Sequence, residues 1–146
     1  MDQQKELMQE LLIETATHYT LGNRCHTDGT CAYALQERRC AFGRIMTDEA
    51  LDTICMRGSN TGYSAQDVLR LLGANALQEK WRPIAFAESR QMNFMTSLQL
   101  LHDRENHWTA KGISVWGEDY ARIIALSFNL DWPAISKAIE EHMTKE

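Results

Sequence analysis

Cysteine and histidine are the usual protein ligands of zinc, and five such residues lie between residues 25 and 55. Structural zinc sites are built from ligand pairs separated by about two to four residues, because that turn points both side chains at one ion. Here five, eight and fourteen residues separate successive cysteines. We therefore expect buried thiols and no cofactor, with zinc as the alternative. The candidate ligands are Cys25, His26, Cys31 and Cys40, and the cysteines expected in the core are Cys31, Cys40 and Cys55.

Cys40 also has clustered positive charge nearby in the sequence, from Arg38, Arg39 and Arg44. Positive charge favours the thiolate, which is the reactive form of cysteine. A nucleophilic cysteine additionally needs a base within hydrogen-bond reach, and the sequence identifies none. The two apolar residues that follow Cys40 are typical of a protein interior. We interpret Cys40 as a core residue.

His102 and Asp103 form the other pair whose types suggest chemistry. In helical metal-dependent phosphohydrolases, an adjacent histidine and aspartate bind the metal together with an upstream histidine and a downstream aspartate. No histidine lies between His26 and His102, so this ligand set is incomplete. The phosphate-binding patterns GxGxxG and GxxxxGK[ST] are also absent. We expect a structural histidine near a helix end. The alternative is a small metal-dependent hydrolase or nucleotide-processing enzyme that uses His102 and Asp103.

Further polar residues lie at two predicted helix ends and suggest a cluster. Asp48 and Glu49 fall in the first turn of one predicted helix, whereas Gln99, His102 and Asp103 lie near the end of another. If these ends meet, their side chains form one hydrogen-bonded cluster that joins several elements. A buried polar network that fixes the fold is the favoured interpretation, and a catalytic site is the less favoured one.

The composition limits the kinds of partner. The chain has 146 residues, 44% of them hydrophobic, as in a single globular domain over residues 1–146. Twenty acidic and fifteen basic residues give a net charge of -5, which disfavours nucleic acid and anionic membranes, because lysine and arginine bind such partners. The N-terminal stretch MDQQKELMQELLIE has no basic region followed by an apolar run. We expect no signal peptide or transmembrane span, and a cytoplasmic location with reduced thiols.

Apolar residues recur every three or four positions through most of the chain, which predicts helices. Thr47, Ser114 and Asp131 are typical N-cap residues. Two apolar runs on either side of the polar residues 36–38 predict a short hairpin. The expected fold is mostly α, a compact bundle of five or six helices with at most one short β-hairpin. The predicted helices cover residues 4–20, 47–55, 64–72, 84–104, 114–128 and 131 onward, and the predicted strands cover 31–35 and 39–43.

The four tryptophans are Trp81, Trp108, Trp116 and Trp132. We expect most of them to be core residues that anchor one helix against another. The sequence leaves open a surface position for one or two of them, where tryptophan contributes strongly to protein–protein contacts.

Two stretches together resemble a family of small proteins from phages and bacteria: TCAYALQERRCAFGRIMTDEAL at 30–51 and SLQLLHDRENHW at 97–108. The shared pattern is Cys-x-Tyr, then Cys-Ala-x-Gly, an apolar pair and Asp-Glu, followed later by Leu-Gln-x-x-His-Asp and a tryptophan. The resemblance extends from about residue 25 to residue 130. It implies a phage-type origin and supplies no mechanism. The pattern falls on Cys31, Tyr33, Cys40, Ala41, Gly43, Asp48, Glu49, Leu98, Gln99, His102, Asp103 and Trp108.

A small acidic helical protein of phage type is typically an accessory that binds another macromolecule. We therefore expect a protein-binding module whose partner is a host or phage protein, in its most specific form an inhibitor of a host or defence protein. Such a protein would act in the host cytosol. Neither nucleic acid nor a membrane is an expected partner, and a homodimer is compatible with the sequence. The hydrolase described above and a zinc-stabilised scaffold are the alternatives.

Overall fold

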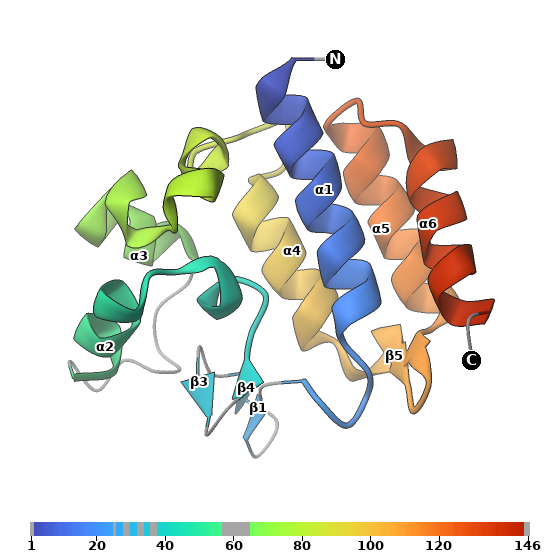
Figure 1. Cartoon of the computed structure of the whole chain (residues 1–146), viewed down its shortest axis with the longest axis horizontal. Coiled ribbons are helices and arrows are strands. Elements are labelled where there is room, and N and C mark those ends of the chain that lie inside the picture. Colours follow the sequence, from blue (N-terminus) through green and yellow to red (C-terminus); the bar gives the residue numbers. More distant parts are fainter. Residues whose placement is uncertain are drawn as a thin grey trace.

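Helices make up most of the chain, as the periodicity predicts. The computed structural model describes residues 2–24, 26–27, 30–31, 34–35, 38–56 and 65–144, and for residues 26–27, 30–31, 34–35, 38 and 55–56 it describes the backbone only. A mostly α-helical fold with a short hairpin is confirmed. The described residues form six α-helices (Figure 1): α1 Gln3–His18, α2 Asp48–Met56, α3 Ala65–Leu72, α4 Phe94–Asp103, α5 Val115–Ser127 and α6 Trp132–Thr144. Four 3₁₀ turns join them: η1 Gly43–Ile45, η2 Ala74–Ala76, η3 Glu79–Ile84 and η4 Glu105–His107.

The three predicted N-caps all act as caps. Thr47 Oγ1 accepts a hydrogen bond from the backbone N–H of Ala50, and Ser114 Oγ accepts one from Gly117, each over 3.1 Å. Asp131 caps α6 in the same way over 3.2 Å. Each cap satisfies a backbone donor that has no partner inside its own helix. The predicted start at residue 64 lies outside the described residues.

The predicted long helix over residues 84–104 is wrong, because only its second half is α-helical. A 3₁₀ turn ends at Ile84 and α4 begins at Phe94. Between them, Ser89 Oγ accepts from the N–H of Met92 over 3.1 Å, and Asn93 Oδ1 caps α4 by accepting from Thr96 over 3.2 Å. Serine and asparagine side chains compete with the helix for backbone hydrogen bonds, so they start a new helix here instead of continuing the old one.

Short strand pairs lie beside the helices. β3 Ala34–Leu35 and β4 Arg38–Arg39 pair antiparallel, so a hairpin forms where one was predicted. The predicted strand over 39–43 is wrong beyond Arg39, because the chain turns there and continues into η1. Two more two-residue pairs occur among the described residues in addition to the single hairpin expected. They are β1 His26–Thr27 with β2 Thr30–Cys31, and β5 Trp108–Thr109 with β6 Gly112–Ile113.

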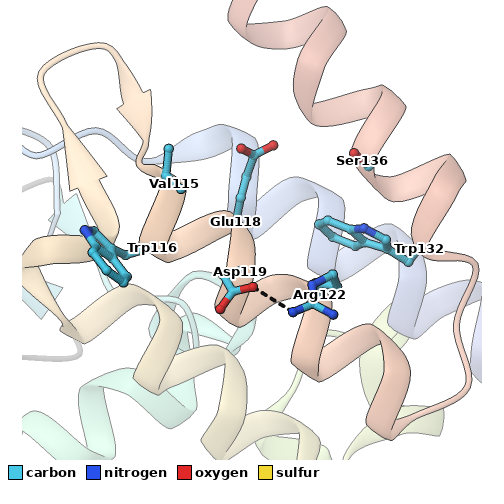
Figure 2. A pocket seen from close by; sticks show the side chains of 7 residues that line it. All are labelled: Val115, Trp116, Glu118, Asp119, Arg122, Trp132 and Ser136. Atoms are coloured by element: carbon cyan, nitrogen blue, oxygen red, sulfur yellow. Dashed lines mark hydrogen bonds and ion pairs between the residues drawn. The ribbon is translucent and has the colours of Figure 1, made fainter.

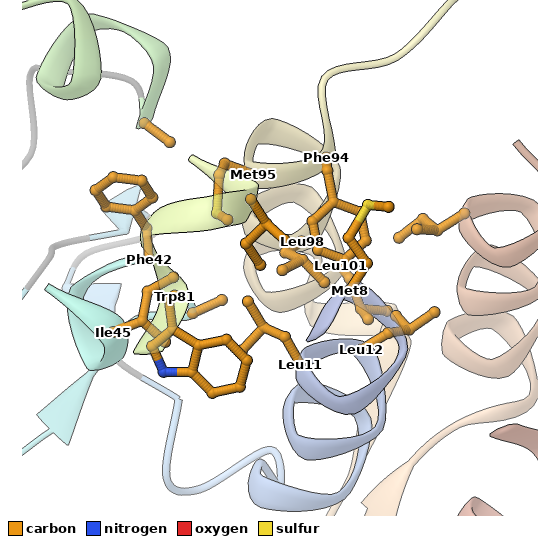
Figure 3. Packing of buried hydrophobic residues seen from close by; sticks show 14 of the residues in the cluster. Met8, Leu11, Leu12, Phe42, Ile45, Trp81, Phe94, Met95, Leu98 and Leu101 are labelled. Carbon is orange, nitrogen blue, oxygen red and sulfur yellow. The ribbon is translucent and has the colours of Figure 1, made fainter. Parts of the chain in front are cut away.

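The core lies mainly around α1, which contacts α4, α5 and α6. Figure 3 shows Leu11 and Leu12 of α1 and Leu98 and Leu101 of α4 within one continuous buried cluster. Burying a side chain of this size contributes about 1.5–3 kcal/mol. This cluster therefore fixes α4, the helix that carries His102, firmly against α1. Among the described residues, no helix is both long enough and apolar enough to cross a membrane.

The two ends of α5 are held by different interactions, a close backbone contact at its start and a hydrogen-bonded turn at its end. Near the N-terminal end, Gly117 lies so close to η4 that an added Cβ would lie 2.4 Å from the carbonyl oxygen of His107. At the C-terminal end, the N–H of Leu130 donates to the carbonyl of Ala125 over 2.8 Å, and Asn129 adopts a positive φ of 57°. This Schellman-type ending reverses the chain and lays α6 along α5.

Candidate functional site

The adjacent residues His102 and Asp103 are hydrogen-bonded to each other in the last turn of α4. His102 Nδ1 lies 2.8 Å from Asp103 Oδ1, so the ring donates and the carboxylate accepts. The side chain of Gln99, one turn earlier, donates to the same oxygen over 2.7 Å. The His102 side chain is 0% exposed and that of Asp103 is 29% exposed. The pair therefore lies at the edge of the core, with the ring inside and the carboxylate partly in solvent.

The predicted polar cluster forms in part. Gln99 accepts a hydrogen bond from the backbone N–H of Phe42 over 3.1 Å, which joins α4 to the chain after β4. Asp48 and Glu49 are exposed in the first turn of α2. Among the described residues, no hydrogen bond or ion pair joins them to Gln99, His102 or Asp103. Their position agrees instead with the attraction of acidic side chains to the positive end of a helix.

A buried arginine closes the end of α4. Arg24 Nη1 donates to the carbonyl oxygens of His102 and Asp103 over 3.1 and 2.8 Å, and the residue is only 3% exposed. The last carbonyls of a helix have no partner within it and carry partial negative charge, so a guanidinium group there stabilises the helix end. The sequence gives no signal for this role, because Arg24 is 78 positions away from His102.

Two aromatic residues after α4 complete the capping. Trp108 Nε1 donates to the carbonyl oxygens of Leu101 and His102 over 3.2 and 3.0 Å, and His107 Nδ1 donates to Leu101 over 2.9 Å. The rings of Tyr19 and His102 meet edge to face with their centroids 4.7 Å apart. Tyr19 also donates through its hydroxyl to the carbonyl of Arg39 over 2.7 Å. Aromatic packing and backbone hydrogen bonds thus enclose the histidine, which is the arrangement of a structural network.

The ring of His107, next to this region, favours the neutral form. Burial, reinforced by the positive charge of Arg104 and Arg24, lowers the pKa of His107 below its ordinary value, although its hydrogen bond to Leu101 opposes the shift. The His107 ring stacks on Tyr120 with centroids 5.2 Å apart, and burial raises the pKa of that phenol. Neutral rings of this kind pack well between helices.

The cysteine residues can be compared with the zinc hypothesis only in part. Cys40 is fully buried, as predicted, and its sulfur accepts a hydrogen bond from the N–H of Gly43 over 3.2 Å. Cys25 and the side chains of His26, Cys31 and Cys55 lie outside the described residues. Among the residues that the structure does describe, no three histidine, cysteine, aspartate or glutamate side chains gather as a metal site would require.

The tryptophans divide between the interior and the surface. Trp81 and Trp108 are buried, Trp132 is half-buried, and Trp116 on α5 is 68% exposed. Trp116 thus takes the surface position that the sequence left open for a tryptophan. Sequence reasoning did not identify which one.

Trp116 belongs to a larger apolar surface, which we call the outer face of α5. On the side of this helix away from the core, Val115 is 79% exposed, Ile123 41% and Leu126 59%. Between them, Arg122 Nη2 and Asp119 Oδ1 form an ion pair over 2.8 Å. This surface could have been found from the sequence, because large apolar residues at positions 115, 116, 123 and 126 lie away from the buried side of the helix.

The outer face borders a groove of 340 Å³ between α5 and α6. Figure 2 shows that Trp116 and the Asp119–Arg122 pair project from α5, whereas Trp132 and Ser136 line the α6 side. The groove is open and contains both apolar and charged groups. Among the described sites, it is therefore better suited to contact with a partner than the enclosed His102.

Comparison with protein-family models, with curated proteins and with solved structures finds no match to this chain.

Proposed function

We propose that this chain is a helical protein-binding module that contacts its partner through the outer face of α5. The observation that supports the proposal is the exposure of Val115, Trp116, Ile123 and Leu126 on one 13-residue helix. Contiguous exposed apolar side chains are uncommon on monomeric proteins and typically mark interaction surfaces. Tryptophan is the residue type most enriched among those that dominate binding energy.

The rigidity of α5 adds to its suitability for binding. Its opposite side is anchored by the buried residues Gly117, Ala121, Ile124 and Ala125. A partner would therefore meet side chains on a preformed helix, and little backbone entropy would be lost on association. A preformed apolar surface of this kind favours binding to a folded protein.

The expected partner is a host or phage protein, and the chain would act on it as an accessory in the cytosol. The resemblance to small phage proteins supports this part of the proposal, and the net charge of -5 disfavours nucleic acid and anionic membranes as the partner. In its most specific form, the module is an inhibitor that covers a working surface of a host or defence protein.

An enzyme that uses His102 and Asp103 is the alternative function. The burial of His102 argues against it, because a reacting atom has to come within hydrogen-bond distance of a catalytic ring. A zinc-stabilised scaffold is the second alternative. Metal analysis of the purified protein separates these cases: stoichiometric zinc favours the scaffold, and a divalent ion required for turnover favours the enzyme.

Capture from a bacterial lysate tests the proposed function. We expect the immobilised wild-type chain to retain a specific protein and Trp116→Ser to lose it, because the indole supplies a large part of the contact. Phe86→Ser is the matched control, since Phe86 is equally apolar and 59% exposed but lies outside α5. Equal capture by the wild type and by Trp116→Ser would contradict the proposal.

A further inference from the structure

The outer face of α5 is complementary to itself. With 3.6 residues per turn, Val115, Asp119, Arg122 and Leu126 fall on one stripe about 60° wide, opposite the buried side of the helix. Reading along the stripe, the order is apolar, acidic, basic, apolar. The two apolar positions, 115 and 126, are symmetric about the midpoint between residues 120 and 121. The two charged positions, 119 and 122, are symmetric about the same midpoint.

We propose that α5 of one copy packs antiparallel against α5 of a second copy, around a two-fold axis that passes between residues 120 and 121. This inference rests on the proposed function, because it takes the outer face of α5 as a contact surface. It goes further by identifying a partner, a second copy of this chain. An interface of this type is isologous: each residue meets its complement twice.

Charge complementarity selects the antiparallel orientation. In this arrangement, Asp119 of each copy lies opposite Arg122 of the other, and Val115 lies opposite Leu126. Asp119 and Arg122 already form an ion pair over 2.8 Å within one helix, so two copies bring four alternating charges together. A parallel pairing would instead place Asp119 against Asp119 and Arg122 against Arg122. Like charges directly opposite each other disfavour that orientation.

The residues beside the stripe are covered by the same arrangement. Trp116 and Ile123 lie together on one flank of it, about a quarter turn from Val115. The two-fold rotation places the flanks that carry Trp116 and Ile123 on the same side of the helix pair. Trp116 of one copy therefore lies next to Ile123 and Leu126 of the other. All four exposed apolar side chains of α5 thus gain apolar neighbours.

The size of the surface predicts the strength of the dimer. A helix of 13 residues is about 20 Å long, and one face of it buries less than the roughly 800 Å² per partner of a standard stable interface. We therefore expect a reversible dimer with Kd on the order of micromolar. Such a dimer is measured by sedimentation of the purified full chain over a range of concentrations.

Charge reversal tests the arrangement. Asp119→Arg alone and Arg122→Asp alone each place like charges opposite each other at both positions of the dimer, and we expect self-association about tenfold weaker or more. An equimolar mixture of the two variants restores opposite charges across the interface and should form a mixed dimer. The double variant Asp119→Arg/Arg122→Asp should dimerise with itself again. Recovery of a dimer in the mixture also shows that the two single variants are folded.

Arg70→Asp is the matched control. Arg70 is exposed and pairs with Asp67 three residues earlier on α3, so its reversal disturbs an ion pair of the same spacing outside the proposed interface. It should leave the dimer unchanged. The proposal is overturned if the wild-type chain remains monomeric at the highest attainable concentration, if single reversals leave the dimer intact, or if the mixture fails to recover it.

The result can be separated from that of the proposed function. A monomeric wild type that still captures a lysate protein through Trp116 would overturn the self-association and leave the binding module standing. A dimer that responds to charge reversal but captures nothing would support the present inference and count against a foreign partner.

Discussion

Asp103 Oδ1 receives two hydrogen bonds, one from the ring of His102 and one from the amide of Gln99. The backbone oxygens of the same two residues, His102 and Asp103, are bound by Arg24. A histidine held in this way has a fixed tautomer and a fixed orientation. Those are properties that a network needs in order to join α4 to the chain segments around it.

Replacing His102 should therefore cost stability. We expect His102→Ala to lower the free energy of unfolding by about 1–3 kcal/mol, because it leaves buried polar partners without a hydrogen bond and opens space beside Tyr19. Chemical denaturation measures the change. Asp103→Asn retains an oxygen acceptor and should cost less. If His102→Ala left stability intact but abolished a measurable activity, the structural interpretation would be wrong.

The pH dependence of stability should depend in part on His107. Because its pKa is lowered in the folded chain, the unfolded chain takes up the proton more readily, and protonation favours unfolding. The stability from this group is fully present above about pH 6.5, the ordinary value, and is lost as the pH falls through the lowered pKa. Acidification should therefore destabilise the protein.

His107→Asn tests this prediction, because the asparagine amide can replace Nδ1 as the donor to Leu101 and does not titrate. Denaturation at about pH 7.5 and about pH 5 should show the wild type losing more stability than the variant. His18, whose pKa is lowered by burial and by Arg44, contributes in the same direction, so some dependence remains. Parallel losses in the two proteins would contradict the prediction.

At the scale of single elements, caps were predictable and a helix break was not. Thr47, Ser114 and Asp131 each bind a backbone N–H three residues ahead, so the information lies within one turn of sequence. The failure over residues 84–104 came from apolar residues that continue a helical spacing although the backbone turns at Ser89 and Asn93. Spacing alone does not show whether a serine or asparagine binds its own backbone.

Gly117 sets how closely α5 approaches η4. Alanine in a helix is normally about 1 kcal/mol more favourable than glycine. Here the added Cβ would lie 2.4 Å from the carbonyl oxygen of His107 and 2.6 Å from Ile113 Cγ1. We therefore expect Gly117→Ala to destabilise the protein by about 1–3 kcal/mol, against the helix propensity.

Thermal denaturation with Gly22→Ala as control checks this prediction. A Cβ at Gly22 would meet only Thr20 Oγ1, at an ordinary 4.0 Å, so that variant should melt close to the wild type. An unchanged or raised melting temperature for Gly117→Ala would show that α5 can move away from η4.

For the whole molecule, the sequence predicted the helical class and the burial of Cys40, but not which distant residues meet. Asp48 and Glu49 were expected beside His102, and they remain exposed on α2. Arg24 was not considered, yet it binds the end of α4. Local propensity depends on a few neighbouring residues, whereas such pairings depend on the packing of the entire core, which no short pattern contains.

The buried thiol of Cys40 should report on the opening of this core. We expect Cys40 to resist alkylation in the folded protein, because its side chain is fully buried. Its labelling should follow unfolding and become faster in Gly117→Ala. Mass-resolved labelling measures the rate at this one site. Rapid modification of Cys40 under native conditions, without a matching loss of stability, would instead revive the interpretation of this residue as a nucleophile.

The contact between α1 and α6 joins the two ends of the sequence, and it includes a hydrogen bond from the N–H of Asp131 to the side chain of Gln9. During synthesis, α6 leaves the ribosome more than a hundred residues after α1. At about 5–20 residues per second, α1 waits roughly 6 to 25 seconds for α6. Through that interval part of its apolar side has no permanent cover. The apolar side of α1 is therefore most exposed to chaperones and to aggregation before α6 emerges, and the docking of α6 covers it.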